Sequence, residues 1–312
     1  MSALIQEVET TPAATTTPAP TTPAVDAKVP AKTIEITEAA TTNDENSGDN
    51  GVNDGEEVGK YKFMQCPPVE FPMKKDREAK ALVQKWGFEA DMVYEQFRFD
   101  EAFDQKRIPT FLKDFFNSRE VQATLKVSSK RSGLVHMMGE AKEVEHEVLK
   151  TTVLNMSFWD KLKEEGITGG DGYIRGCMPE RYHGAESGSL LREMFMNEDS
   201  ESYLCYDDEE RSEFLFRVMQ SLCIGGSMCQ PETNMKAYLD NAKAVYKSMV
   251  SVRKKSSTNK LYIDSTVISV SNVKGSLQLF PDSENPFNFC YISVDPARRL
   301  LTYWSMAFVD FW

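Results

Sequence analysis

The sequence predicts an α+β fold, with a single domain over residues 60–312 that follows a disordered tail over residues 1–59. Three observations lead to this prediction. Apolar residues recur at helical spacing through the middle of the chain, they alternate with polar residues near its end, and aromatic residues are absent from the first 59 positions. With 312 residues, 41% apolar and 27% charged, the chain has the composition of a globular protein.

The predicted tail differs from the rest of the chain in charge. Residues 1–59 contain eleven Asp or Glu and two Lys, so they carry −9 of the formal net charge of −12. A stretch rich in Thr, Pro and Ala precedes the acidic stretch NDENSGDNGVNDGEE, and neither offers enough apolar surface to offset the entropy of ordering. Neither part of the chain has the basic surplus typical of nucleic-acid-binding proteins.

The start of the chain carries no recognisable targeting segment. MSALIQEVETTP has neither the basic-then-apolar layout of a secretory signal nor the arginines of a mitochondrial transit peptide. The sequence has no run of about 18 apolar residues, so a membrane-spanning helix is not expected. We therefore predict a cytoplasmic protein whose six cysteines are free thiols and which uses no cofactor.

The first part of the domain is predicted to mix strands and helices. YKFMQC alternates like a strand before Pro67 stops it, and Pro109 precedes an apolar helical face that includes Phe111 and Phe115. The predicted elements are strands at 61–66, 123–129, 133–139 and 146–156, helices at 76–87, 89–99, 109–125, 157–166 and 189–196, and a loop at 166–188.

The segment SEFLFRVMQSLCIGGSMCQPE has the strongest helical pattern. Apolar pairs recur every four residues in FLFRVMQSLC, which predicts a helix over 207–224. The glycine pair that follows supplies the positive φ that ends a helix, and a proline precedes a second helical pattern over 235–249. We therefore predict an antiparallel helical hairpin. Its predicted turn residues are Gly225, Gly226 and Pro231.

The end of the chain is rich in β-branched and aromatic residues that alternate with polar ones. Asp295 and Pro296 lie between two such runs and predict a tight turn. We expect an antiparallel sheet with the helical hairpin packed on one face. The predicted strands span 260–270, 288–294 and 298–309.

Cysteine and histidine spacing leaves a metal site open as an alternative. Structural zinc sites usually place about two to four residues between paired ligands. In this chain Cys223 and Cys229 are separated by five residues, as are Cys177 and His183. The plainer interpretation is that these are core and turn residues. The alternative function is a metal-stabilised domain or metalloenzyme that uses Cys177, His183, Cys223 and Cys229.

Other motifs are too incomplete to indicate an enzyme. GITGGDGY lacks the Gly-Lys-Ser/Thr of a phosphate loop, and SVRK matches Ser-x-x-Lys without its companion motifs. Of the three histidines, His136 and His146 fall in strand-like runs, where a structural role is the default. We therefore predict a binding or scaffold protein with no catalytic residues.

Basic and aromatic residues near the end of the chain are candidates for a partner-binding surface. Arginines and lysines flank the predicted terminal sheet, where a solvated rim is the alternative. The final stretch FVDFW is either an aromatic anchor for a partner or a strand that packs inward. The candidate partner-binding residues are Arg253, Lys254, Arg298, Arg299, Phe308 and Trp312.

Three segments carry a resemblance when they occur together and in this order: FLFRVMQSLCIGGSMCQPE, AVYKSMVSVRK and YISVDPARRLLTYW. They are similar to the cilia- and flagella-associated protein 300 family. Weaker similarity through LNMSFWDKL and FRFDEAFDQ extends the resemblance over most of residues 60–306. The family's most distinctive positions, which suit structural or interfacial roles, are Phe214, Leu215, Leu222, Gly225, Gly226, Cys229, Arg253, Asp295, Pro296 and Arg299.

The resemblance implies a non-enzymatic protein of motile cilia. Such proteins are understood to help assemble or transport the inner and outer axonemal dynein arms, in the cytoplasm and in the cilium. The implied partners are dynein arm assembly factors and co-chaperones, with dynein subunits or the ciliary transport machinery as further candidates. Neither nucleic acid nor a membrane is implied.

Overall fold

A computed structural model describes residues 60–75, 77–129 and 133–310. The predicted tail over 1–59 and the candidate anchor Trp312 lie outside these residues. Within them, the main sheet is antiparallel and has the strand order β1–β2–β12–β11–β10–β5. Its strands are β1 (Phe63–Gln65), β2 (Met92–Phe99), β5 (Ala141–Leu149), β10 (Thr266–Gly275), β11 (Phe289–Asp295) and β12 (Leu300–Met306).

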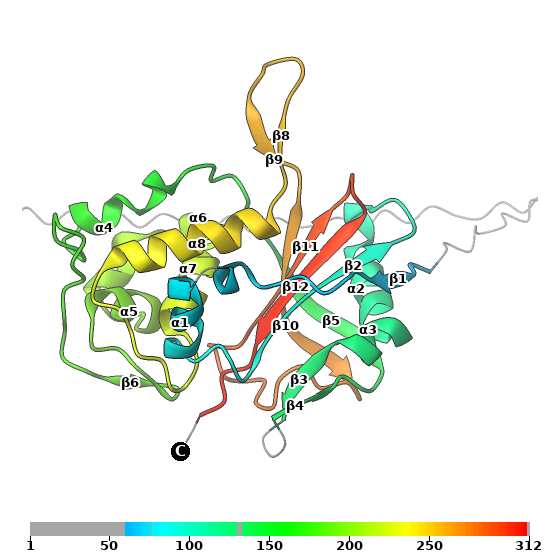
Figure 1. The fold of residues 1–312 in the computed structure, drawn as a ribbon, viewed down its shortest axis with the longest axis horizontal. Coiled ribbons are helices and arrows are strands. Elements are labelled where there is room, and N and C mark those ends of the chain that lie inside the picture. Colours follow the sequence, from blue (N-terminus) through cyan, green and yellow to red (C-terminus); the bar gives the residue numbers. More distant parts are fainter. Residues whose placement is uncertain (1–59, 76, 130–132, 311–312) are drawn as a thin grey trace, which may run out of the picture. The chain divides into compact units, whose positions relative to one another are not determined.

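Helices cover both faces of this sheet (Figure 1). Successive side chains along a strand point to opposite faces. On β11, Phe289 and Tyr291 therefore pack toward the layer that contains α7 (Phe214–Ile224) and α8 (Met235–Met249). Cys290 and Ile292 pack toward the layer that contains α2 (Ile108–Asn117) and α3 (Arg119–Thr124). The predicted α+β class is confirmed, and the sheet has a second helical layer that the sequence did not indicate.

The predicted helical hairpin forms the centre of the first layer. Its two helices are antiparallel, since Phe214 at the start of α7 meets Tyr246 near the end of α8, with ring centroids 5.6 Å apart. At the opposite end of the hairpin, Tyr238 stacks on Trp86 at 4.8 Å. The helices of this layer are α1 (Arg77–Lys85), α4 (Lys161–Glu164), α5 (Leu190–Met196), α6 (Asp208–Arg211), α7 (Phe214–Ile224) and α8 (Met235–Met249).

The second layer is smaller and has an aromatic core. The rings of Phe111 and Phe115 on α2 lie edge-to-face against Phe63, at 5.2 and 5.1 Å. The backbone N–H of Tyr61 donates to the carboxylate of buried Asp114 at 3.0 Å, which ties the segment before β1 to this helix. The layer contains α2 (Ile108–Asn117), α3 (Arg119–Thr124), β3 (Lys126–Ser129) and β4 (Gly133–His136).

Two further hairpins lie outside the main sheet. One pairs β6 (Arg181–Tyr182) with β7 (Ala185–Glu186), and the other pairs β8 (Val252–Lys254) with β9 (Leu261–Ile263). The β8–β9 hairpin follows α8 directly and projects from the body of the domain (Figure 1). No helix among the described residues combines the length and the apolar character that crossing a membrane requires.

The prediction of a helix over 89–99 is wrong, because this segment contains strand β2. Its apolar residues fit a helical repeat, yet they also alternate: Val93 and Phe97 face the second layer, whereas Tyr94 faces the first. The strand pairs with β12, where Tyr94 lies opposite Trp304. A short apolar run cannot be assigned by periodicity alone, and the pairing that decides it comes from the far end of the chain.

Several predicted elements differ in extent. The helix predicted over 207–224 divides at Glu213, whose backbone is extended (ψ 133°) and which forms a β-bridge with Lys150. The helix predicted over 109–125 divides at Ser118, where ψ is 130°. The strand predicted over 146–156 ends at Leu149, the one over 260–270 divides into β9 and β10, and 157–166 forms a 3₁₀ turn capped by Asn155 followed by α4.

Candidate functional site

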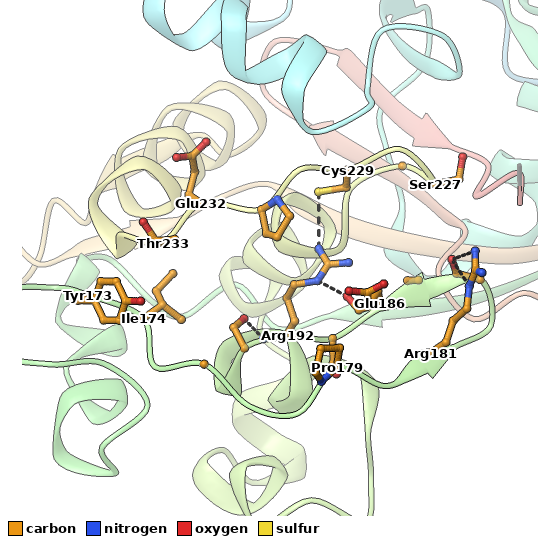
Figure 2. Close-up of a pocket in the computed structure, with 18 residues that line it drawn as sticks. Tyr173, Ile174, Pro179, Arg181, Glu186, Arg192, Ser227, Cys229, Glu232 and Thr233 are labelled. Carbon is orange, nitrogen blue, oxygen red and sulfur yellow. Dashed lines mark hydrogen bonds between the residues drawn. The ribbon is translucent and has the colours of Figure 1, made fainter.

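A cavity of about 580 Å³ lies beside the turn that joins α7 to α8 (Figure 2). Its walls are the turn itself, the start of α5 and the segment around the β6–β7 hairpin. Gly226 and Cys229, both singled out in the sequence, line it. The charged residues that line it are Arg181, Glu186, Arg192 and Glu232.

Arg192 of α5 is a buried charge at the centre of this cavity, with 4% of its surface exposed. Its Nε donates to the carbonyl of Glu186 at 2.7 Å, and its Nη1 donates to the carbonyls of Cys223 and Ile224, the latter at 3.1 Å. Those last carbonyls of α7 have no partner within the helix, and a cation near them also complements the helix dipole. Arg192 therefore joins α5 to the end of α7.

The glycine turn brings two distant segments into backbone contact. Gly225 has a φ of 62°, and a Cβ there would lie 2.4 Å from the carbonyl oxygen of Trp86. The N–H of Gly226 donates to that same oxygen at 2.9 Å. The N–H of Gln230 donates to the carbonyl of Lys85 at 2.8 Å. The glycines thus serve the helix ending and the close approach of the chain that follows α1.

Pro231 lines the cavity and does not begin the second helix. The cap of α8 is Asn234, whose side chain accepts from the N–H of Lys236 at 2.9 Å. Between them, the Glu232 carboxylate forms an ion pair of 2.6 Å with Lys85 at the end of α1. The segment after the glycines is therefore fixed to α1 before α8 starts.

The four residues of the metal alternative are not gathered into one site. Cys177 Sγ lies 3.8 Å from a carboxylate oxygen of Glu193, whereas the ring of His183 packs edge-on against Phe287. Cys223 is fully buried inside α7. Within residues 60–75, 77–129 and 133–310, no group of three or more His, Cys, Asp or Glu side chains could hold a metal ion. The structure therefore does not favour the metal alternative.

The thiols near the turn are poor nucleophiles. Burial raises the pKa of Cys229, and raises that of Cys223 well above its ordinary value, although the charge of Arg192 opposes both shifts. Arg192 Nη1 lies 3.6 Å from Cys229 Sγ. Since the thiolate is the reactive form, these two cysteines suit packing better than chemistry.

A second cluster lies in the turn between β11 and β12, at the base of the β8–β9 hairpin. The side chain of Asp295 is 7% exposed, and its Oδ1 accepts from the backbone N–H groups of Ala297 and Arg298 at 3.1 and 3.0 Å. Arg298 Nε lies 3.6 Å from Asp295 Oδ2. Asp295 therefore organises the turn that contains Pro296.

Asp295 also connects this turn to the β8–β9 hairpin. Arg253 Nη2 lies 3.7 Å from Asp295 Oδ1, while Arg253 Nε lies 2.6 Å from Asp264 Oδ2. The hydroxyl of Ser251, the serine of the SVRK motif, donates to Asp295. Burial alone would raise the pKa of Asp295, but the Ser251 and backbone hydrogen bonds and the two arginines hold it below its ordinary value.

The remaining candidate partner-binding residues are divided between surface and interior. Lys254 is exposed on the hairpin. Arg299 has a φ of 50° and donates from Nη1 to the carbonyl of Asp100. Phe308 is 2% exposed and packs against Phe287, with ring centroids 5.6 Å apart. Phe308 therefore packs into the domain and is not exposed as an aromatic anchor for a partner.

Sequence reasoning missed Arg192. The signal was present, because Arg192 lies within SLLREMFM among residues that the helical period places on the buried face. An arginine in such a position requires buried acceptors. Those acceptors are carbonyls at the end of a different helix, and nothing in the local pattern identifies them.

Comparison with known proteins places this arrangement in a family. A family model described as cilia- and flagella-associated protein 300 matches residues 60–306. The chain belongs to the cilia- and flagella-associated protein 300 family. The match begins before β1 and ends with the last residue of β12, so it spans the main sheet and both helical layers.

Two relatives bear the name cilia- and flagella-associated protein 300. The protein from Paramecium tetraurelia is 32% identical over 227 residues, which is 72% of this chain and 86% of the relative. The protein from Chlamydomonas reinhardtii is 28% identical over 253 residues, which is 78% of this chain and 98% of the relative. No solved structure matches the chain. The predicted resemblance is confirmed, and the family names support a ciliary or flagellar location.

Proposed function

We propose that this member of the cilia- and flagella-associated protein 300 family is a non-catalytic factor in the assembly or transport of axonemal dynein arms. The observation that carries the proposal is the family match over residues 60–306, together with the ciliary and flagellar names of the relatives. Dynein arms drive the beating of a cilium or flagellum, so a factor of this kind is needed for its motility. The proposed locations are the cytoplasm, where arms would be preassembled, and the axoneme.

The structural roles of the best chemical candidates support a binding protein. The hydroxyl of Ser251 donates to Asp295, an acceptor within the fold. Loss of solvent around their thiols raises the pKa values of buried Cys223 and half-buried Cys229. Arg192 uses its donors on carbonyls of the fold. Each of these side chains is engaged in holding the domain together.

The proposed partners are dynein arm assembly factors and co-chaperones, with dynein subunits or the transport machinery as further candidates. The β8–β9 hairpin supports this proposal, because it projects from the domain and exposes both cationic and apolar side chains. Lys254 is exposed there, and Val252, Leu261 and Tyr262 are 42–55% exposed. Exposed apolar patches rimmed by polar residues are typical of interaction sites.

Affinity purification of the tagged full-length chain from ciliating cells, followed by mass spectrometry, tests the proposal. We expect axonemal dynein chains or their assembly co-chaperones to be enriched over a tagged control protein while arms are being built. A preparation without any of them at that stage would contradict it.

We also propose that the chain divides near residue 60 into a tail and one domain. Limited proteolysis of the full-length chain tests this division. The first stable fragment should begin close to residue 60. A stable fragment that begins well inside residues 60–306 would contradict it.

A further inference from the structure

A second cavity, of about 560 Å³, lies beneath the β8–β9 hairpin and away from Arg192. It is bounded by the last turns of α8, by residues 153–156 and by the start of β8. Its floor is apolar and includes Leu215 and Tyr246, which are 1% and 7% exposed. Leu154 and Val252 stand at its edges with 46% and 49% of their surface exposed. We call this cavity the hairpin groove.

The charged side chains that line the hairpin groove are lysines, and no carboxylate lines it. They are Lys243 and Lys247, both exposed on α8. Among the described residues, neither lysine forms an ion pair. At the start of the same helix the pattern is different, because Lys236 pairs with Asp240 at 2.5 Å. The groove therefore combines apolar walls with uncompensated positive charge.

Two other lysines, Lys150 and Lys161, do have carboxylate partners. Lys150 lies 2.9 Å from Glu209, and Lys161 pairs with Glu210. Glu213, the carboxylate next to the groove floor, is buried and accepts from the N–H of Thr152 at 3.0 Å. Acidic groups near the groove are thus already engaged by the fold and do not neutralise Lys243 and Lys247.

The β8–β9 hairpin extends both the apolar surface and the positive charge of the hairpin groove. Leu261 pairs with Lys254, so both lie on the same face of the hairpin as Val252, and Leu261 is 55% exposed. Lys254 at the end of β8 is exposed, and the turn adds the exposed lysines Lys255 and Lys260. An occupant of the groove would therefore meet more apolar surface and more positive charge at the hairpin.

We propose that the hairpin groove binds an acidic amphipathic segment of a partner protein. Large apolar side chains of that segment fill the groove, and its Asp or Glu side chains meet Lys243 and Lys247. Burial of Leu154 and Val252 supplies affinity, while the lysines select the sign of the partner's charge. This inference rests on the proposed function, because it names the chemistry of a partner for a binding protein.

The shape of the surface favours a protein segment over a lipid bilayer. A bilayer-inserting loop carries apolar side chains at its tip. The tip of this hairpin is KSSTNK, residues 255–260, which is entirely polar and exposed. The apolar side chains lie instead along the strands and inside the concave groove, where they can contact one face of an inserted helix.

Binding of synthetic peptides to the full-length chain tests the proposal. The probe is a fluorescent peptide of about 15 residues with Leu at i, i+3, i+4 and i+7 and Glu elsewhere. A second peptide replaces Glu by Lys, and a third keeps the composition of the first in scrambled order. Fluorescence anisotropy should show that the acidic amphipathic peptide binds at least about tenfold more tightly than the other two.

Two groove variants and two matched controls locate the binding. Leu154→Glu and the pair Lys243→Glu with Lys247→Glu should each weaken binding of the acidic peptide by about tenfold. Leu204→Glu changes another exposed leucine, and Lys80→Glu with Lys142→Glu makes the same change of charge elsewhere. Both controls should stay within about twofold of the original chain. Matching urea midpoints would show that every variant is folded.

Three outcomes would overturn the proposal. The first is equal binding of the acidic and basic peptides, and the second is equal weakening by groove and control variants. The third is a combination of results. The original chain sediments with phosphatidylserine vesicles but not with phosphatidylcholine vesicles, the groove variants do not sediment with either, and the acidic peptide does not bind to the original chain. That result would assign the groove to an anionic lipid surface.

Rescue of ciliated cells that lack their own family member separates this inference from the proposed function. If the original chain fails to restore dynein arms, the proposed function fails. If the original chain restores them and the Lys243→Glu/Lys247→Glu variant does so equally well, the groove inference fails while the proposed function stands. Restoration by the original chain and the control variants, but not by the groove variant, supports both.

Discussion

Helix α8 has a different kind of structure at each end. The α7–α8 turn precedes it and the β8–β9 hairpin follows it, and the family resemblance includes residues from both. The turn is fixed by contacts with two other segments. Gly225 and Gly226 contact the backbone that follows α1, and Arg192 donates to the carbonyls at the end of α7, just before the two glycines. The hairpin is fixed at its base by Asp295 and exposes the rest of its length.

The two regions show two different reasons why a position can require a particular residue type. In the turn, the specificity is geometric, because atoms of two backbones occupy the space that a side chain would need. On the hairpin, the specificity is chemical, because side chains with no partner in the fold are free to contact another molecule. Substitutions in the turn should therefore affect stability, and substitutions on the hairpin should affect binding.

The largest effect is expected from Gly225→Ala, whose new Cβ would lie 2.4 Å from the Trp86 oxygen. Gly188→Ala is its control, since Gly188 has a φ of 67° and an added Cβ would meet no atom within 4 Å. Positive φ strains an alanine at both positions by about 1 kcal/mol, and the ψ of −156° at Gly225 adds to this because essentially only glycine adopts that combination. The clash should bring the loss at Gly225 to about 3 kcal/mol in urea unfolding. Equal losses at the two positions would show that the close approach does not matter.

Arg192→Met should have the next largest effect. It leaves the carbonyls of Cys223 and Ile224 buried without a donor, at a cost of about 2 kcal/mol in the free energy of unfolding. Arg181→Met, on the same cavity but with a side chain 54% exposed, is the control and should cost less than about 0.5 kcal/mol. A small effect at Arg192 would mean that water or another group can satisfy the end of α7.

Asp295→Asn tests the fixed base of the exposed hairpin, and its effect should depend on pH. The folded-state pKa of Asp295 is lowered, so its ionised form contributes stability above the unfolded pKa of about 3.9 and loses it as the pH falls through the lower folded value. We expect Asp295→Asn to lose about 1 kcal/mol at pH 7 and much less near pH 3. Urea unfolding at both values, with exposed Asp199→Asn as the control, measures this. A loss that stays constant with pH would refute the electrostatic explanation.

Lys254→Glu should have the smallest effect on stability. Its side chain is exposed on the hairpin and forms no ion pair among the described residues, so the urea midpoint should be unchanged. Capture of the proposed dynein-arm partners should nevertheless decrease, because the substitution reverses a charge on the docking surface. A clear shift of the midpoint would show that the hairpin belongs to the stable core of the domain.

The helical hairpin was predictable because its information is local. Apolar pairs at a spacing of four identify α7, and the glycines after it identify where it ends. The strand pairing of β11 with β12 was predictable for the same reason, since Asp295 and Pro296 mark a tight turn between two alternating runs. These elements need nothing from the remainder of the chain to be recognised.

The candidate sites were less predictable, because they depend on contacts between distant segments. Arg192 was missed because its acceptors belong to another helix, and the hairpin groove was missed because its walls come from three separated stretches. The arginines expected to form a free basic patch are partly engaged, since Arg253 and Arg298 both approach Asp295. A count of charges along a sequence does not reveal which of them are already paired.

The sequence by itself determined the α+β class, the helical hairpin, the terminal antiparallel strands and the resemblance to the family, because each rests on short-range periodicity or on a specific string of residues. The tertiary structure decided that residues 92–99 form a strand, that helices cover both faces of the sheet, and that the α7–α8 turn is closed while the β8–β9 hairpin is exposed. The physical reason is that strand pairing, burial and ion pairing are long-range. They are fixed by which distant segments meet, and local composition constrains that only weakly.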